Sequence, residues 1–280
     1  MTTPPEYAAN KVIEMMQIEL EKSREQLAEE YIHVSSRINE LAFDKYGIAK
    51  VTPELLADYK ARRVMNSIIA AGIKDPIVLD LFTGIGGDTV ALAKAGFNVL
   101  TIELDEVRHQ HAKQNANLYH VDKNIIFALG DGFLYLRAGS IDGLPLNFDA
   151  VVSAPTLTDK IEPGSTAHVK RLEEMTVDCI ELLSLVRKYT PNVCLMLPKN
   201  MDREQVRSMG ICEIEETYMN GDLFYLSVYF GCLMNKEGTT KAMAEHPLYK
   251  YSKRKAESDF PIVNYSKGDS VSDFKGDFHV

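Results

Sequence analysis

The residues with the clearest chemical potential follow four apolar segments, one after another along the chain. The segments at 77–79, 98–102, 124–129 and 148–152 lead to Asp80, Glu103, Gly130-Asp131 and Ser153. Apolar segments of this length are typical of buried strands in a parallel sheet. Because the carboxyl ends of such strands meet at one edge of the sheet, we expect three carboxyl groups and one hydroxyl to lie close together. Such a site suits a ligand that carries hydroxyl groups and positive charge.

A glycine-rich turn separates the first segment from a predicted helix. The turn reads Gly84-Ile85-Gly86-Gly87, and the helix begins at Asp88. Strand, glycine turn and helix form the nucleotide-binding crevice of open α/β sheets, although the turn alone also suits other α/β proteins. The dinucleotide pattern G-x-G-x-x-G is not met, because Thr89 stands where its last glycine would be. Asp88 would repel a pyrophosphate. S-adenosylmethionine (SAM) has no phosphate, is positively charged and suits carboxylate partners, so the turn predicts a SAM site.

Two of the acids fit particular parts of SAM. Glu103 lies about 20 residues after the glycine turn, where an acid can bind both ribose hydroxyls. Asp131 can accept a hydrogen bond from the adenine amine, with Phe133 or Phe82 against the ring. Four successive strands with polar groups at their carboxyl ends are typical of a class I methyltransferase.

The remaining pattern predicts an α/β fold. We expect the Rossmann-like, seven-stranded sheet of a class I SAM-dependent methyltransferase, with an N-terminal helical extension. Residues 211–219 and 223–230 flank Asn220-Gly221-Asp222, which predicts an antiparallel hairpin as the last two strands. Further helices are expected over 105–120, 131–138, 168–188 and 202–209.

Three regions differ in composition. Residues 1–50 are expected to form the extension, with one or two helices over 7–43. Residues 51–234 hold the predicted methyltransferase domain, in which Thr52 caps a helix, Pro53 takes its first position and Glu54 faces its dipole. Residues 235–280 are rich in Lys, Ser, Gly and Asp, and they are expected to form a polar, flexible tail.

Composition limits the classes of function. The 280 residues carry a formal net charge of −9, which argues against a broad surface that coats nucleic acid and still allows a local basic patch. There is no apolar run of membrane-spanning length and no signal-peptide pattern, so we expect an intracellular protein of the nucleus or cytoplasm that does not enter membranes. The four cysteines are expected to be reduced core residues. His109, His111 and His120 are expected at the surface, with no metal site.

Several segments resemble the family of trimethylguanosine synthases, or RNA cap guanine-N2 methyltransferases. They are VTPELLADYKARRV, DLFTGIGGDTVALAKAGFNVLTIELD, HQHAKQNANLYHVDKNIIFALGDGF, VCLMLPKNMDREQV and EIEETYMNGDLFYLSVYFG. The last two are the more specific, because any SAM enzyme can share a glycine turn. The resemblance implies a SAM-dependent enzyme whose partner is RNA, with a capped 5′ end as the expected substrate.

The resemblance also implies a set of cofactor-binding residues. They are Thr52, Asp80, Phe82, Gly84, Asp88, Thr89, Glu103 and Asp131, to which we add Gly86 and Gly132 from the same two turns. Asp88 stands where the family typically has Asn, and Glu103 where it has Asp. Both differences keep a hydrogen-bond acceptor, so both remain compatible with SAM.

The loop after the fourth strand differs more from the family. Members have Ser-Pro-Pro-Trp, and this chain has Ser153-Ala154-Pro155-Thr156. By resemblance Ser153 and Pro155 are the predicted catalytic residues, in a reaction that depends mostly on positioning an amine for in-line attack on the SAM methyl. The predicted substrate-binding residues are Thr156, Lys199 and Asn200. The family's tryptophan stacks on 7-methylguanine through a cation–π contact, and this chain contains no tryptophan.

Three interpretations follow from this difference. The protein could be a divergent cap N2-methyltransferase in which Tyr249, Tyr251 or another aromatic residue replaces the stacking tryptophan. It could methylate a different amine in RNA. It could also be a non-enzymatic relative that keeps the fold for a binding or scaffolding role, although the acids at three strand ends favour an enzyme.

Overall fold

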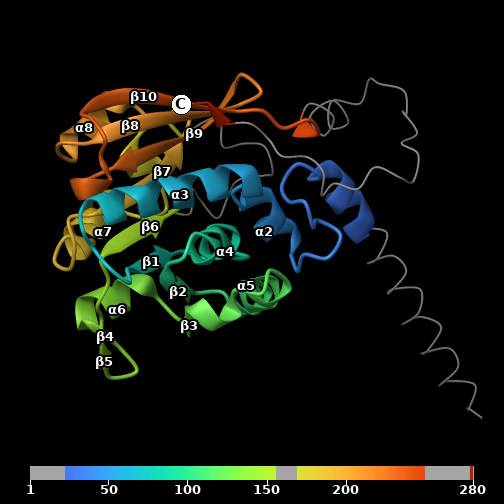
Figure 1. The fold of residues 1–280 in the computed structure, drawn as a ribbon, viewed down its shortest axis with the longest axis horizontal. Coiled ribbons are helices and arrows are strands. Elements are labelled where there is room, and N and C mark those ends of the chain that lie inside the picture. The colour runs from blue at the N-terminus through green and yellow to red at the C-terminus, as the bar shows by residue number, and fades with distance from the viewer. Residues whose placement is uncertain (1–22, 156–168, 250–277, 280) are drawn as a thin grey trace, which may run out of the picture.

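A mostly parallel sheet forms the centre of the protein. The computed structural model describes residues 23–155, 169–249 and 278–279, with the sheet order β11-β10-β8-β9-β7-β6-β1-β2-β3 (Figure 1). The strands are β1 (Ile77–Leu81), β2 (Asn98–Glu103), β3 (Ile125–Leu129), β6 (Ala150–Ser153), β7 (Val193–Pro198), β8 (Glu213–Met219), β9 (Asp222–Tyr229), β10 (Gly238–Ala244) and β11 (Phe278–His279). A separate small hairpin pairs β4 (Ser140–Ile141) with β5 (Leu144–Pro145). Strands β1, β2, β3, β6 and β7 pair in parallel, so their carboxyl ends share one edge.

Helices cover both faces of the sheet. One face packs against α3 (Glu54–Ala70), α4 (Gly87–Lys94) and α5 (Glu106–Leu118), and the other against α6 (Gly132–Ala138), α7 (Cys179–Val186) and α8 (Arg203–Ser208). Figure 1 shows α3 and α4 in front of the sheet. Each face has its own apolar core, because a strand buried on both sides needs a helix layer on each. This arrangement confirms the predicted α/β class.

The predicted hairpin is confirmed, although its strands are not the last two of the sheet. Strands β8 and β9 pair antiparallel around Asn220 and Gly221, which have φ values of 50° and 82°. Both residues lie in the left-handed region, as a two-residue turn of this kind requires. Asn and Gly are the residues that adopt this conformation at the lowest cost.

The sheet is wider than the expected seven strands. Residues 238–244 form β10, which pairs in parallel with β8, and β11 pairs with β10. The expectation of a flexible tail from residue 235 is therefore wrong for this segment. The reason is its short alternation, in which Ala242 and Ala244 are buried while Lys241 and Met243 point outward. Residues 250–277 lie outside the described part of the chain.

The N-terminal extension is helical only in part. Residues 23–30 are helical, residues 31–40 form turns, and α2 spans Lys45–Lys50. The expectation of helix up to residue 43 is wrong for the second half, where turns bring Val34 and Ile38 into a small apolar cluster with Ile85 of the glycine turn. Residues 1–22 lie outside the described part of the chain. The extension thus packs against the predicted site.

Some smaller expectations also need correction. Helix α7 is shorter than the predicted 168–188, since it begins after its cap Asp178 and follows a separate short turn at Leu172–Glu174. Two other short turns are Asp122–Asn124 and Gly231–Leu233. His109 is buried, with its ring edge-on to Phe127, so its expected surface position is wrong. Its spacing of three and seven residues from Ala112 and Ala116, which are both buried, places it on the face of α5 that packs against the sheet.

Three of the four cysteines are buried and Cys232 is half-buried, and all four are free thiols. Within the described residues no helix is both long and apolar enough to cross a membrane. The same part of the chain contains no group of three or more His, Cys, Asp or Glu side chains that could hold a metal ion.

Buried ion pairs join α3 to the hairpin. Arg63 contacts both Glu213 and Glu215 of β8, and its guanidinium lies 3.7 Å from the ring centroid of Tyr229. Tyr59 donates to the same Glu215 at 2.7 Å. Because all these groups are buried, α3 is fixed relative to the sheet, and so is the beginning of α3 at the predicted site.

Replacing Arg63 by methionine is expected to lower the free energy of unfolding by about 3–5 kcal/mol, because Glu213 and Glu215 stay buried without their cation. Urea unfolding followed by circular dichroism measures the loss. The control is Arg137→Met, which removes an ion pair to Glu181 that is about half exposed and is expected to cost less than about 1 kcal/mol. Equal losses in the two variants would contradict a structural role for the Arg63 contacts.

Candidate active site

A large cavity lies at the carboxyl edge of the parallel strands. Its volume is about 640 Å³, within the range of sites that bind small molecules. Ten predicted site residues line it: Thr52, Asp80, Phe82, Gly84, Asp88, Glu103, Asp131, Gly132, Pro155 and Lys199. Residues that are far apart in the sequence therefore meet in one place, as expected from parallel strands that end at one edge.

Asp80 forms the floor of the cavity. It is the fourth residue of β1, is 2% exposed and accepts a hydrogen bond from the hydroxyl of Thr89 on α4. Burial, with the charge of Asp88 nearby, raises the pKa of Asp80 to about 8. Loss of solvent favours the neutral acid, and the Asp88 carboxylate adds to this effect. A cation in the cavity would favour the ionised form of Asp80.

Glu103 ends β2 and is held by two backbone donors. The amide of Gly84 donates to one carboxylate oxygen at 2.7 Å, and the amide of Asp105 to the other at 2.9 Å. Arg108 adds a longer contact of 3.7 Å between its Nε and Glu103. These contacts fix the carboxylate on the cavity wall, where it can accept hydrogen bonds from two hydroxyl groups.

The glycine turn leaves room for a ligand at one position and packs tightly at another. Gly84 has φ of +57°, and a Cβ there would point into open space, which the cavity supplies. Gly86 has φ of +90°, and a Cβ there would lie 3.1 Å from the backbone of Ala112 in α5. Gly86 therefore brings α4 and α5 together and does not line the large cavity.

Asp131 and Phe82 line the cavity, whereas Phe133 packs beside Phe82 and does not reach the cavity wall. Asp131 caps α6 by accepting from the amide of Phe133 at 2.8 Å. The rings of Phe82 and Phe133 lie 6.4 Å apart between centroids. Phe82 adopts φ of 65°, an unfavourable conformation for a bulky residue, directly after β1. Strained backbone of this kind is concentrated at functional sites.

Several predicted residues do not line the cavity. Thr89 is wholly buried and can act only through Asp80. Ser153 is also wholly buried, and its hydroxyl has no hydrogen-bond partner, whereas Ala154 and Pro155 reach the cavity wall. Asn200 is absent from the lining, and Thr156 lies outside the described residues. The predicted contact of the Ser153 hydroxyl with a substrate is therefore not present in this geometry.

The sequence predicts that Thr52 caps α3, and this prediction is wrong. Pro53 occupies the cap position without a side-chain bond, and the Thr52 hydroxyl donates instead to Asp88 Oδ2 at 2.9 Å. Asp88 Oδ1 lies 2.7 Å from Nζ of Lys60, which is 1% exposed. Lys60 is not among the site residues that the sequence predicts. Its spacing of four residues from both Leu56 and Val64 is the signal that places it on the buried face of α3.

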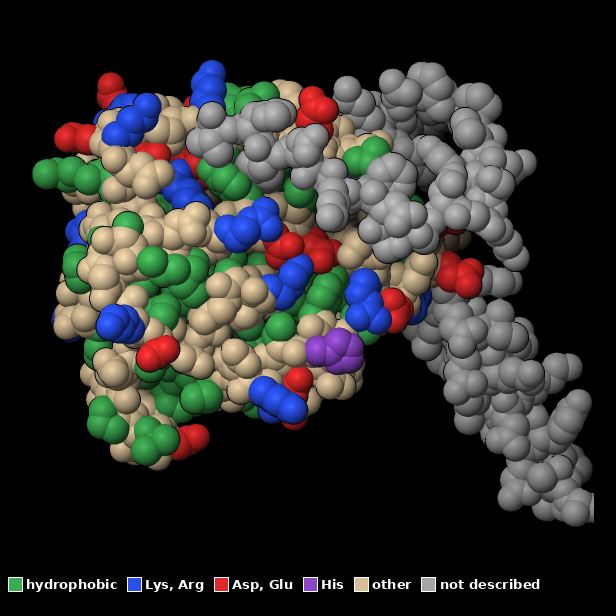
Figure 2. Space-filling view, in the orientation of Figure 1, with side chains coloured by type: hydrophobic (Ala, Val, Ile, Leu, Met, Phe, Trp, Pro, Cys, Tyr) green, Lys and Arg blue, Asp and Glu red, His purple; other side chains and the backbone are tan. Residues whose placement is uncertain are grey.

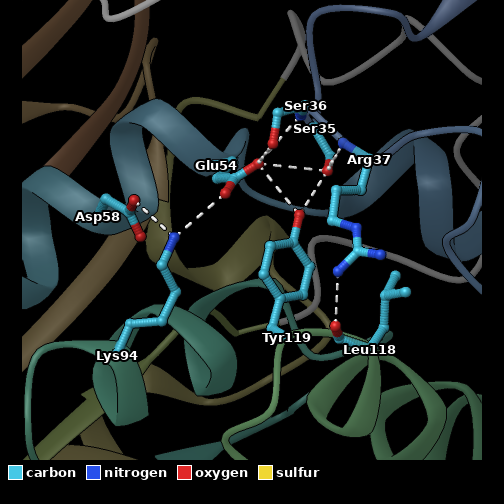
Figure 3. Close-up of polar contacts among 8 residues, drawn as sticks. All are labelled: Ser35, Ser36, Arg37, Glu54, Asp58, Lys94, Leu118 and Tyr119. Carbon is cyan, nitrogen blue, oxygen red and sulfur yellow. Dashed lines mark hydrogen bonds and ion pairs between the residues drawn. The ribbon is translucent and has the colours of Figure 1, made fainter. Parts of the chain in front are cut away.

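The N-terminal extension is fastened to the site by Glu54 (Figure 3). One Glu54 oxygen accepts from the backbone and hydroxyl of Ser36 and from the hydroxyl of Tyr119, at 2.9–3.1 Å. The other accepts from Lys94 at 3.1 Å, and Lys94 also pairs with Asp58. Arg37 adds a bond to the carbonyl of Leu118. The extension, α3, α4 and α5 are thus joined two residues from Thr52.

Aromatic residues from three separate segments line the other side of the cavity. His33 comes from the extension, Phe224 from β9 and Tyr249 from the segment after β10. Tyr249 packs edge-on to both other rings, at centroid distances of 5.2 and 6.0 Å. Burial and the nearby His246 lower the pKa of His33 to about 4, so this wall is uncharged at neutral pH. Among the residues that the structure describes, the cations that line the cavity are Lys50, Arg108 and Lys199.

The cavity fits SAM. Gly84 leaves space for close approach, Glu103 offers two carboxylate oxygens, and the acids Asp80 and Asp88 suit a ligand with positive charge. A phosphate ligand fits poorly because Asp88 lies in the first turn of α4. In SAM enzymes the cofactor supplies an activated methyl group on a positively charged sulfur. Thr52, Asp80, Asp88, Glu103 and Asp131 would hold it here.

The sheet and the strand-end acids define the class I SAM-dependent methyltransferase fold. A crystal structure of a protein described as a methyltransferase from Porphyromonas gingivalis W83 shares it, with a TM-score of 0.52 and 15% identity, over 70% of this chain and 44% of that one. A sequence profile of RNA cap guanine-N2 methyltransferases matches residues 75–233, more than half of the chain, and the protein belongs to that family. SAM is the cofactor of the family.

One curated relative is trimethylguanosine synthase of Schizosaccharomyces pombe. It is 25% identical over 162 residues, which cover 57% of this chain and 64% of the relative. The match thus spans somewhat less than two thirds of the relative's length.

Proposed function

We propose that this protein transfers a methyl group from SAM to an amine of RNA, and that the amine is N2 of guanine in a 7-methylguanosine cap. Family membership supports the reaction class. The observation that carries the proposal is the single cavity that joins the strand-end acids to Pro155, Lys199 and an aromatic wall. Cofactor and substrate base can lie side by side in it, as in-line transfer requires.

The chain's own residues would act mainly by positioning. Glu103 and Asp131 would orient the adenosine part of the cofactor, so that its methyl group points toward β6 and β7. The backbone of Ala154 and Pro155, at the end of β6, would accept hydrogen bonds from the attacking amine. The amine becomes positively charged as it gains the methyl group, and it then loses a proton to water, while the backbone carbonyls only accept hydrogen bonds from it. Holding the amine and the methyl group in line supplies most of the rate.

Charge in the cavity suits a capped RNA end more than a long RNA. The protein carries a net charge of −9, and Figure 2 shows acidic and basic side chains interspersed over α3 and α4 on the face in view. Lys50, Arg108 and Lys199 line the cavity and can contact the phosphates of a cap. Arg203 holds the Lys199 carbonyl at 2.8 Å and so keeps this loop in place.

The aromatic wall is our candidate for the missing stacking residue. Tyr249 lines the cavity, whereas Tyr251 lies outside the described residues. An uncharged aromatic surface can stack on a flat purine, and a positively charged 7-methylguanine adds a cation–π attraction. This interpretation keeps the cap as substrate although Thr156 stands where the family has tryptophan.

Tyr249→Leu is expected to raise the KM for capped RNA about tenfold and to leave SAM affinity unchanged, because one stacking contact is worth about 1–3 kcal/mol. Tyr249→Phe keeps the ring and should behave like the wild type. Steady-state kinetics with capped RNA measures KM, and calorimetry measures SAM affinity. An unchanged KM in Tyr249→Leu would reject stacking by this residue. Deletion of all residues after 240 would also remove Tyr249, but it would delete most of β10 and so disturb the sheet as well.

The proposal is tested by methyl transfer from labelled SAM. The substrates are a 7-methylguanosine cap analogue, capped RNA and the same RNA without a cap, with methylated nucleosides separated by chromatography. Label in dimethyl- or trimethylguanosine supports the cap reaction. Label only in another nucleoside would move the proposal to a different RNA amine, which the changed loop at Ala154 and Thr156 favours as second candidate. No label on any RNA, with SAM still bound, would favour a scaffold.

A further inference from the structure

A buried cation stands behind the cofactor side of the cavity. Lys60 is 1% exposed and does not line the cavity, yet its Nζ lies 2.7 Å from Asp88 Oδ1. Nζ also contacts the sulfur of Met196 and lies 5.7 Å from the ring centroid of Tyr225. The charge of Lys60 also acts on Asp80, whose pKa it lowers. The Lys60–Asp88 pair therefore joins α3 to the first turn of α4.

Asp88 connects this pair to the cavity. Its second oxygen accepts from the Thr52 hydroxyl at 2.9 Å, and Asp88 and Thr52 both line the cavity. Lys60 thus holds one carboxylate oxygen, and Thr52 holds the other. The carboxylate is fixed in one orientation by Thr52, which directly precedes the cap residue of α3, and by Lys60 in the second turn of α3.

The ion pair also accounts for a carboxylate in this position. A buried anion is unfavourable without a nearby cation. Lys60 supplies that cation. Removal of one member of a buried pair leaves the other uncompensated, whereas replacement of both by neutral groups can be well tolerated.

We propose that Lys60 is a positioning residue for SAM. Its ammonium group holds the Asp88 side chain in the orientation that faces the positively charged amino-acid end of the cofactor. Asp88 raises the pKa of Asp80 and Lys60 lowers it, so the cation partly offsets the effect of one acid on the other. The inference rests on the cofactor-binding half of the proposed function and is independent of which RNA amine is methylated.

The test is a double-mutant cycle of Lys60→Met, Asp88→Asn and the two together. Calorimetry measures binding of SAM and of 5′-methylthioadenosine, which shares the adenosine part but lacks the amino-acid end. Each single variant is expected to lower the ratio of SAM affinity to methylthioadenosine affinity at least about tenfold. Lys60→Met loses the charge-assisted contact between a positioned Asp88 and the amine of SAM, and Asp88→Asn leaves the unpaired cation of Lys60 facing that amine. The double variant should return to within about threefold of the wild-type ratio, because the introduced side-chain amide can accept from the amine without a buried cation beside it.

The outcomes separate this inference from the proposed function. If the wild type binds no SAM, the cofactor-binding half of the proposed function fails. If the wild type binds SAM and the single-variant effects simply add in the double variant, only the role of Lys60 is rejected. A parallel loss of both ligands in Lys60→Met, with an unchanged ratio, would show a purely structural role. If Lys60→Met does not fold, recovery of folding and of the wild-type ratio in the double variant supports the coupling, and failure to recover overturns it.

Discussion

Replacing Glu103 by alanine is expected to weaken SAM binding about 100-fold, because two hydrogen bonds from ribose hydroxyls to a charged acceptor are lost at about 1.5 kcal/mol or more each. The carboxylate is held by the amides of Gly84 and Asp105, so its position depends little on the ligand. Calorimetric titration with SAM measures the change. Glu103→Gln, which retains one oxygen acceptor, should lose less.

The control for this prediction is Glu237→Ala, which removes an exposed acid and should leave the SAM affinity at the wild-type value. If Glu103→Ala bound SAM as tightly as Glu237→Ala, the ribose would not lie against β2, and our placement of the cofactor would be wrong.

SAM affinity is expected to fall about tenfold for each pH unit below about 8. The cationic cofactor binds best to ionised Asp80, whereas burial keeps this acid protonated below about pH 8, so binding must first remove its proton. The raised pKa of Asp80 acts in the opposite direction on the stability of the protein without SAM, which it lowers as the pH rises. The unfolded chain releases the Asp80 proton near its ordinary value of 3.8, and the folded chain releases it only near 8. The contribution of Asp80 to stability without SAM should therefore be greatest below the ordinary value and fall as the pH rises between the two values.

The Asp80→Asn variant is the control for the pH prediction. The α-amino group of SAM itself titrates near pH 8, so part of any pH dependence belongs to the ligand. Asp80→Asn should bind SAM less tightly at pH 8.5 and should lose the part of the pH dependence that belongs to the protein. Equal pH profiles for the wild type and Asp80→Asn, from titrations between pH 6 and 9, would contradict the assignment.

Much of the site could be predicted because parallel strands follow a simple rule. Asp80, Glu103 and Asp131 each follow an apolar segment, and the sheet brings such strand ends to one edge. The hairpin around Asn220 and Gly221 was equally predictable, since its turn needs residues that tolerate positive φ.

Side-chain direction was harder to predict than strand position. The hydroxyl of Ser153 lies at the correct strand end but points into the protein, because β6 is covered on both faces and its last residue is wholly buried. Thr52 was predicted as a helix cap from local sequence alone. Its actual partner, Asp88, is 36 residues away, and only the packing of α3 on α4 brings the two together.

Cavity-lining residues outside the part of the chain that matches the family could not be predicted from motifs. His33 and Tyr249 flank the matched residues 75–233, and they meet because β10 adds to the sheet and the extension packs across the glycine turn. Strand β10 was missed because its segment, GTTKAMA, is short and its apolar residues are confined to its last three positions. Pairing with β8 supplies its backbone hydrogen bonds, which composition does not report.

The most direct test of the account is a crystal structure of the protein with S-adenosylhomocysteine. We predict that the ligand occupies the 640 Å³ cavity, with its ribose hydroxyls bound to Glu103, its adenine beside Asp131 and its amino-acid end toward Asp88. A ligand bound elsewhere, or one with its ribose directed away from Glu103, would contradict the central claim that these strand-end acids form the cofactor site.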